Sequence, residues 1–291
     1  MILKAAAKVN LYLNVLGSRK DGYHEIESII QSVTLYDRII LKREKKKIRV
    51  FSNQLGVPQG EKNICYRAAE LFLRKTGIKE GIILEIQKSI PLQAGLGGGS
   101  ADAAATLWGM NKLFETKVSL SELLKWGEVL GADVPFCLRG GTYLVKGKGE
   151  ILIPLPSIKR GWLILLYPKI PISTCWVYKK ATSFSSSPRK RLNIDLFVKE
   201  TKKKGLIGTE TFLYNGLEEI VFREFPSVKM IKEELLKAGA RGSLMTGSGS
   251  TVFGIIEDKR DGERIKSKFQ ERGEIFLVQT VDKSFKEEEG D

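Results

Sequence analysis

The most constraining feature of this chain is a glycine-rich loop between an expected strand and an expected helix. The run 82–90 is β-branched and apolar, which favours an extended strand, and Pro91 ends it because proline cannot donate a hydrogen bond to a sheet. Glycine lets backbone N–H groups approach a ligand without interference from Cβ. The loop contains Gly95, Gly97, Gly98 and Gly99.

An alanine-rich helix is expected directly behind this loop, with Ser100 as its N-cap. The first N–H groups of a helix have no partner within it and carry the positive end of its dipole. The stretch therefore predicts an anion site, most naturally for phosphate. It fits neither the dinucleotide fingerprint nor the P-loop, and close packing of the strand against the helix is an alternative reason for the glycines.

The length of 291 residues is enough for two domains, each with its own core. We expect them over 1–157 and 158–291, with the boundary in the run 154–159. No apolar run approaches the ~20 residues of a membrane span, and the start lacks a signal-peptide pattern, so a cytoplasmic protein is expected. The three cysteines are widely spaced, which favours reduced thiols over disulfides or a zinc site.

The formal net charge of +14 raises the question of nucleic acid. Much of the excess lies in short runs at 42–47, 189–191 and 202–204, without interleaved aromatic residues. Such runs are usually solvated loop tips, so neither a nucleic-acid nor a membrane partner is expected. The same positive field would steer an anionic small substrate to the protein.

Polar and apolar residues alternate along the expected first strand, 5–15. Lys8 and Asn10 share its polar face, so their side chains emerge about 6 to 7 Å apart and one small ligand could bridge them. A solvated strand face would give the same pattern. Tyr23 and His24 follow a turn, and His24 is the only histidine, a residue that is more often structural than functional when it occurs alone.

Asp133 lies in the sequence Gly-Ala-Asp-Val-Pro-Phe, after an expected helix over 120–130. Pro135 disfavours the helical conformation of Val134, the residue before it, so the neighbouring Asp133 is expected on a fixed, non-helical turn. Such an aspartate either caps the turn or, with a lysine nearby, accepts a proton from a hydroxyl group.

The order of the expected elements indicates an α+β protein. In the second domain the order strand, helices, hairpin, helix, strand is that of the split βαβ plan. The run 184–204 is rich in serine, lysine and arginine and predicts a mobile loop. The acidic tail 286–291 is expected to fray.

Three motifs resemble those of the GHMP kinases, the superfamily of galactokinase, homoserine kinase, mevalonate kinase and phosphomevalonate kinase. They are AAAKVNLYLNVLG around Lys8, PLQAGLGGGSADAAATL from Pro91, and MTGSGSTVFGI from Met245. The resemblance covers nearly the whole chain. It implies a two-domain GHMP kinase fold, with a ribosomal-protein-S5-like N-terminal domain and a ferredoxin-like C-terminal domain. It also implies an ATP-dependent small-molecule kinase with Mg²⁺ and an active site between the domains.

Carried over by position, the resemblance implies that Asp133 is the general base and that Lys8 orients the attacking hydroxyl and keeps the aspartate ionised. Phosphoryl transfer depends on such positioning and charge neutralisation. The residues implied around the ATP phosphates are Pro91, Leu92, Gln93, Ala94, Gly95, Leu96, Gly97, Gly98, Gly99, Ser100 and Ala101. The residues implied at the substrate are Asn10, Tyr23, His24, Tyr178, Gly247, Ser248 and Gly249.

The extension GSRKDGYHEIESI is typical of a branch whose substrate carries a cytidine diphosphate group. Tyr23 and His24 would then bind cytosine, and Gly247 to Gly249 the diphosphate. The resemblance also implies a second aromatic side chain that stacks on the cytosine. Trp176 and Tyr178 are both candidates, and we expect Tyr178.

The chain departs from the family at Ala101, where a second serine is frequent. The protein ligands of the metal therefore stay open, with Ser100 and, more weakly, Asp102 as candidates.

Two alternative functions stay open. Another GHMP kinase, for homoserine or mevalonate, would have no use for a cytosine site. A basic ribosomal-protein-like module would bind RNA in a salt-sensitive way without ATP turnover. A monomer or weak homodimer is expected.

Overall fold

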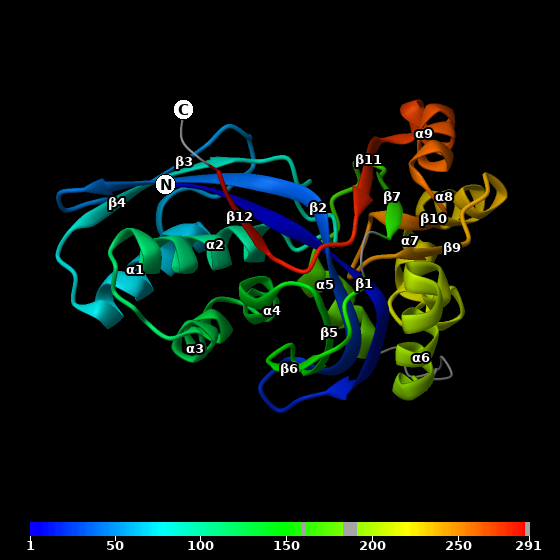
Figure 1. Cartoon of the computed structure of the whole chain (residues 1–291), viewed down its shortest axis with the longest axis horizontal. Helices are drawn as coiled ribbons and strands as arrows, with labels where there is room; N and C mark the ends of the chain where they lie inside the picture. The colour runs from blue at the N-terminus through cyan, green and yellow to red at the C-terminus, as the bar shows by residue number, and fades with distance from the viewer. Residues whose placement is uncertain (159–160, 183–190, 289–291) are drawn as a thin grey trace.

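The computed structural model describes residues 1–158, 161–182 and 191–288, whose strands form two sheets (Figure 1). The larger sheet has eight strands, with the order β12-β1-β2-β4-β3, and β5, β6 and β8 branch from it. Its strands are β1 (Ile2–Ser18), β2 (His24–Glu44), β3 (Ile48–Ser52), β4 (Gly81–Gln87), β5 (Thr142–Gly147), β6 (Ile151–Pro154), β8 (Tyr214–Asn215) and β12 (Phe285–Glu288). The central pair β1 and β2 is antiparallel, with register shifts at three places that interrupt the ladder.

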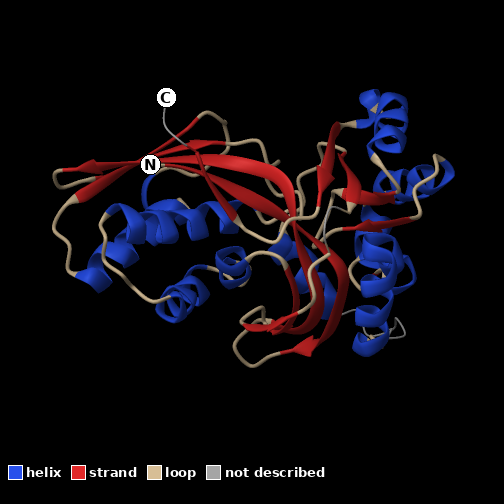
Figure 2. Ribbon diagram, viewed as in Figure 1, coloured by secondary structure: helices blue, strands red, loops and turns tan. Residues whose placement is uncertain are grey.

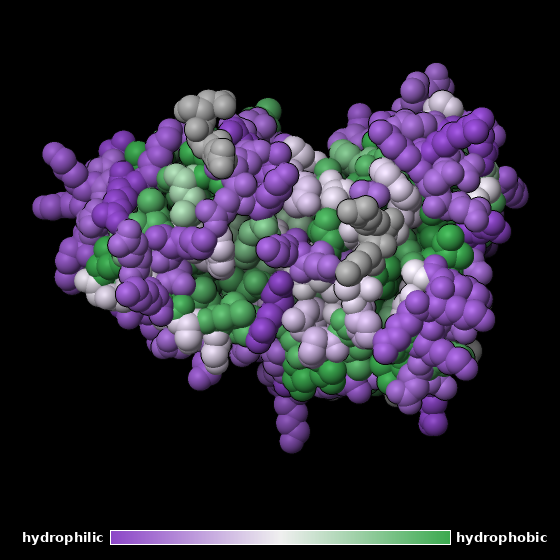
Figure 3. Space-filling model, viewed as in Figure 1, coloured by the Kyte–Doolittle hydropathy of each residue, from purple (hydrophilic) through white to green (hydrophobic). Residues whose placement is uncertain are grey.

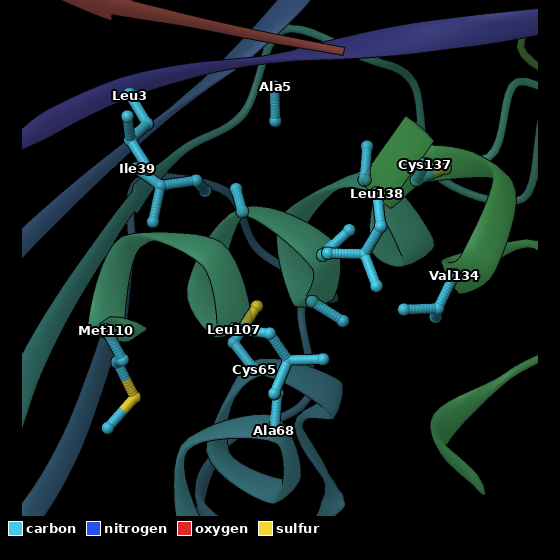
Figure 4. Close-up of a cluster of buried hydrophobic side chains, with 14 of the residues drawn as sticks. Leu3, Ala5, Ile39, Cys65, Ala68, Leu107, Met110, Val134, Cys137 and Leu138 are labelled. Carbon is cyan, nitrogen blue, oxygen red and sulfur yellow. The ribbon is translucent and has the colours of Figure 1, made fainter. Parts of the chain in front are cut away.

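Helices cover one face of this sheet. They are α1 (Ile64–Thr76), α2 (Gly98–Leu113), α3 (Leu120–Leu130) and α4 (Val134–Arg139). Figure 4 shows Leu107 and Met110 of α2 among Leu3 and Ile39 of the sheet and Cys65 of α1. The small alanines of α2 are 0–1% exposed, so this helix fits closely between the sheet and α1. Because α2 begins where the glycine loop ends, its packing fixes the loop.

The smaller sheet is antiparallel throughout, with the order β11-β7-β10-β9. Its strands are β7 (Trp162–Tyr167), β9 (Gly242–Met245), β10 (Val252–Ile256) and β11 (Glu274–Gln279). The helices of this half are α5 (Thr174–Thr182), α6 (Ile194–Lys204), α7 (Glu218–Glu224), α8 (Pro226–Lys237) and α9 (Lys259–Lys268). In chain order the strands lie 4-1-3-2, which agrees with the predicted split βαβ plan. Figure 2 shows the helices of this half largely on the side away from the larger sheet.

An apolar cluster joins the two sheets. Val9 and Leu11 of β1 belong to the same buried cluster as Leu163 and Leu165 of β7 and Phe253 of β10. Burial of apolar surface on this scale opposes relative movement of the two sheets. Two glycine loops, residues 91–100 after β4 and residues 246–249 after β9, are therefore held at a fixed spacing. The predicted boundary between 157 and 158 falls between β6 and β7, and it remains a proposal because β8 and β12 return to the larger sheet.

Two local predictions about helix starts are wrong. Gly97, not Ser100, is the N-cap of α2, with φ 72°, and Ser100 is the third residue of the helix. Asp133 has helical dihedral angles, φ −85° and ψ −11°, and is the N-cap of α4, with Pro135 in the first turn. The physical reason is that proline is tolerated in a first turn, where its missing N–H needs no partner.

Two predictions of disorder are wrong where the structure describes the chain. Residues 194–204 form α6, with Asn193 as N-cap, its side chain accepting from the Leu196 N–H. Phe197 is buried on the inner face, and this anchors a helix whose composition alone suggested a loop. Residues 286–288 pair with β1 as part of β12. The rest of both predictions, at 184–190 and 289–291, lies outside the described residues.

The view in Figure 3 is hydrophilic over most of the molecule. Apolar atoms gather over β6, where Ile151 and Ile153 are 50% and 42% exposed. Within the described ranges, no helix has both the length and the apolar character needed to cross a membrane.

Candidate active site

A pocket of about 450 Å³ lies where the two glycine loops meet β1. This volume suits a small ligand. Its lining includes Lys8, Asn10 and Asp133, together with the whole of 91–100. Another pocket, of about 500 Å³, lies beside β8 and α7 and contains none of the predicted site residues. The first pocket is the candidate site, because it combines a titratable pair with backbone loops.

Lys8 lines the pocket and contacts three other residues of it. Its Nζ donates to Asn10 Oδ1 at 2.7 Å and to the Gly95 carbonyl at 3.1 Å, and lies 3.6 Å from Asp133 Oδ2. The Lys8 side chain is 5% exposed, whereas that of Asp133 is 36% exposed. Two neutral acceptors thus fix the ammonium, which leaves its charge directed at a carboxylate that is open to a ligand.

Asp133 is not used by the fold as a capping side chain. Although it is the N-cap of α4, it makes no side-chain cap hydrogen bond. Tyr178 lies close enough that Asp133 adds to the effect of burial in raising the pKa of the tyrosine. The carboxylate therefore keeps oxygen lone pairs for a hydroxyl group that enters the pocket.

The two glycine loops are in direct contact. A Cβ on Gly95 would lie 2.2 Å from the Thr246 carbonyl, and one on Gly97 would lie 2.9 Å from Lys8 Cγ. Both residues also have positive φ, 76° and 72°. Close packing is thus one reason for these glycines, and it brings the start of α2 against Lys8.

A second lysine lies below the same loop and was missed by the sequence analysis. Lys88 Nζ binds Asp37 Oδ2 and, at 2.7 Å, Asp102 Oδ2. Asp37 Oδ1 also accepts from the N–H groups of Ser89 and Ile90, at 2.6 and 2.8 Å. The available signal was Asp37 itself, an acidic residue that, with Arg38, interrupts the otherwise largely apolar strand sequence TLYDRIIL.

The three side chains of this cluster, Asp37, Lys88 and Asp102, are almost fully buried, 0–5% exposed. Burial raises the pKa of Asp102 to about 8, although Lys88 opposes the shift. Burial lowers the pKa of Lys88, but the two carboxylates outweigh it and the net shift is upward. The cluster ties β2 and the residue after β4 to the N-terminal part of α2.

The predicted cytosine residues lie beside the pocket. The His24 and Tyr178 ring centroids are 5.3 Å apart, and His24 Nε2 lies 2.9 Å from Thr182 Oγ1. Burial lowers the pKa of His24, which favours the neutral ring. Tyr23 is 51% exposed, with Lys148 Nζ 4.8 Å from its ring centre. Tyr178 lines the pocket, whereas Trp176 packs against Phe225.

The structure brings most of the predicted residues together. Gly247 and Ser248 line the pocket with Asn10 and Tyr178. Ala101 does not, because its side chain is 1% exposed in the core below α2. Gly249, Tyr23 and His24 are also outside the lining. Their functional roles stay predictions.

Comparisons with known proteins agree with this geometry. Residues 63–141 match the family model described as the GHMP kinases N terminal domain, and residues 198–275 match the GHMP kinases C terminal model. A protein of Acetivibrio thermocellus named 4-diphosphocytidyl-2-C-methyl-D-erythritol kinase is 41% identical over 96% of this chain and 98% of its own length. A protein of the same name from Caldicellulosiruptor saccharolyticus is 41% identical over 98% of both chains.

Solved structures agree as well. A crystal structure of 4-(cytidine 5'-diphospho)-2C-methyl-D-erythritol kinase matches with a TM-score of 0.81 and 32% identity, over 96% of this chain and 99% of the other. Homoserine kinase from Cytophaga hutchinsonii matches with a TM-score of 0.74 and 21% identity over 98% of this chain and 96% of its own, a likeness of fold. The two-domain α+β fold and the resemblance of the three motifs are confirmed, and the chain is a member of the GHMP kinase family.

Proposed function

We propose that this chain transfers the γ-phosphoryl group of ATP to the 2-hydroxyl of 4-diphosphocytidyl-2-C-methyl-D-erythritol, in non-mevalonate isoprenoid precursor synthesis. The observation that carries the proposal is the pair formed by Lys8 and Asp133 where the two glycine loops meet. The names of relatives about 40% identical over nearly the full length support the substrate.

The chemistry follows from the positions of these groups. Asp133 takes the proton of the attacking hydroxyl, and Lys8 holds that oxygen in line by a hydrogen bond. Residues 91–100 surround the ATP phosphates, with the N–H groups at the start of α2 directed at them. Gly247 and Ser248 face the substrate diphosphate, and His24 and Tyr178 receive the cytosine ring.

We expect Mg²⁺ to accompany ATP. Among the residues with described positions, no three or more His, Cys, Asp or Glu side chains are grouped to hold a metal. Asp102 does not fit as an open ligand, because one carboxylate oxygen binds Lys88 and the other is enclosed without a partner. Ser100 remains, and phosphate oxygens and water would complete the shell of an ion that commonly keeps such ligands.

Release of ADP tests the proposal directly. The purified chain is incubated with ATP and Mg²⁺, with and without 4-diphosphocytidyl-2-C-methyl-D-erythritol. Release that depends on this substrate is the expected result. Release with homoserine or mevalonate instead would keep the kinase class and overturn the substrate, and salt-sensitive RNA binding without any release would favour the rival binding module.

His24→Ala sharpens the assignment of the cytosine site. The variant loses one ring beside Tyr178 and the hydrogen bonds of an imidazole, so KM for the cytidine-bearing substrate should rise about tenfold while KM for ATP changes little. Equal losses for both substrates would place His24 outside the cytosine site. The expected cytoplasmic location and monomeric or weakly dimeric state stay predictions.

A further inference from the structure

Asn215 lies between the two sheets, behind the candidate site. Strand β8 pairs in parallel with β1, with Leu13 opposite Asn215. The Asn215 side chain is buried, 3% exposed. Its Nδ2 donates to the carbonyls of Met245 at 2.7 Å and Gly247 at 2.8 Å, and its Oδ1 accepts from the Leu217 N–H at 2.9 Å. One amide thus joins the larger sheet to the loop that follows β9.

The two carbonyls that Asn215 binds flank Thr246, which is buried against β1. Thr246 Oγ1 accepts from the Asn10 N–H at 3.0 Å. A Cβ on Gly247 would lie 3.0 Å from the Gly95 carbonyl and 3.2 Å from Lys8 Nζ. The loop from Thr246 to Gly249 therefore has Lys8 and the glycine loop 91–100 on one side and Asn215 on the other.

Glu218 gives the same loop a second fixed point. Its Oε1 accepts from the Met245 N–H at 3.0 Å, and its Oε2 binds Lys232 at 2.6 Å. The N–H side of Met245 is therefore held by Glu218 and its carbonyl side by Asn215. Both residues belong to one short segment, 214–218, which itself is paired to the strand that carries Lys8 and Asn10.

Only a primary amide satisfies this arrangement. Two neighbouring carbonyls need two donors, and the Leu217 N–H needs an acceptor, a combination that Asn supplies from one side chain. An aspartate of the same shape would place oxygen against both carbonyls, and a shorter side chain would leave them unpaired. We propose that Asn215 is a positioning residue, which sets the loop 246–249 against Lys8 and Asn10 and so shapes the place for the substrate diphosphate.

Steady-state kinetics of Asn215→Asp and Asn215→Ser test this inference. It rests on the proposed function for the substrate used, so wild-type turnover is measured first. We expect KM for 4-diphosphocytidyl-2-C-methyl-D-erythritol to rise about tenfold or more, with KM for ATP within about twofold. A purely structural role would lower the active fraction and leave both KM values alone. Asn215→Ser introduces no charge and serves if the aspartate variant does not fold.

Asn111→Asp is the matched control. Asn111 Nδ2 also donates to a carbonyl, that of Val118 at 2.9 Å, and its Oδ1 accepts from the N–H of the same residue. It lies near the end of α2, away from the candidate site. This variant should therefore leave both KM values unchanged.

Hydrogen exchange gives a readout that needs no turnover. Amides in the peptide 244–252 should exchange at least about tenfold faster in both Asn215 variants, because two of the bonds that close the loop are lost, and at the wild-type rate in Asn111→Asp. Unchanged exchange in this peptide, or an equal rise of both KM values, would overturn the inference. An inactive wild type would refute the proposed function, while the exchange experiment still decides the role of Asn215.

Discussion

Two buried lysines flank the glycine loop, and their surroundings differ. Lys88 is bound by two carboxylates that are almost completely enclosed. Lys8 has neutral partners at hydrogen-bond distance, and its one carboxylate, Asp133, is 3.6 Å away and one-third exposed. The charge of Lys88 is therefore compensated within the protein, whereas the positive charge of Lys8 also acts on groups in the pocket.

This difference predicts that Lys88 stabilises the fold, whereas Lys8 acts on the substrate. A buried ion pair is costly to break because the remaining charge has no solvent, so Lys88 should matter for the free energy of unfolding. A loose pair with an accessible carboxylate contributes little to stability but leaves both groups available to a substrate. The four predictions below follow this contrast, from the largest expected effect to the smallest.

Lys88→Met should cause the largest loss of stability. The variant leaves Asp37 and Asp102 buried without a cation, which costs about 3–5 kcal/mol. The free energy of unfolding, measured with urea at neutral pH, is the appropriate readout. A loss below about 1 kcal/mol would show that the cluster is not a support for the loop.

Asp133→Asn should instead affect turnover. Loss of a general base lowers kcat by about 10² or more, and ATP affinity should stay nearly constant. Stability should change little, because the fold does not use this side chain as a cap. Steady-state kinetics and ATP titration check the prediction, and a variant with normal kcat would remove Asp133 from the mechanism.

Lys8→Met should have a mixed and intermediate effect. It removes hydrogen bonds to Asn10 and to the Gly95 carbonyl, worth about 1–2 kcal/mol of stability, while Asp133 turns to solvent. Urea unfolding should therefore show a smaller loss than in Lys88→Met, alongside a large fall in kcat. Destabilisation as severe as that of Lys88→Met would abolish the contrast between the two lysines.

The pH dependence of stability should reveal Asp102. Its pKa is raised by burial to about 8, above the ordinary value of 3.8, so the folded chain binds the proton more tightly than the unfolded chain. This contribution to stability is complete at low pH and is lost as the pH rises from about 4 through about 8.

Asp102→Asn cannot ionise and should flatten that part of the curve. Urea unfolding of both proteins between pH 5 and 8.5 measures the two slopes. Parallel curves would mean that Asp102 does not titrate in this range.

Local patterns in the sequence predicted the scaffold well. Asn63 caps the start of α1 and Gly77, in a left-handed conformation, ends it, and both residue types are local signals for these positions. Ser119 caps the helix predicted over 120–130, its side chain accepting a hydrogen bond from the Glu122 N–H. These signals succeed because each depends on hydrogen bonds within a few residues.

Features that depend on tertiary contacts were not accessible in this way. Asp37 and Lys88 are 51 residues apart, and nothing in the local sequence of either indicates that they meet. Helix α2 begins at Gly98, before the predicted cap at Ser100. Gly97 packs against Lys8 of β1 and Gly98 against Lys88, contacts that the local sequence does not indicate. The resemblance of the motifs predicted most residues that line the pocket. The hydrogen bonds that hold its loops in place, such as those of Asn215, could be identified only in the structure.

Strand β12 has a consequence for how the chain is made. Residues 285–288 pair with β1, which is synthesised well before them. That edge of β1 stays unpaired until β12 has been synthesised, and an open edge is a template for pairing with other chains. The larger sheet therefore completes only after synthesis of the second sheet, so a truncated or stalled product would expose the edge and aggregate.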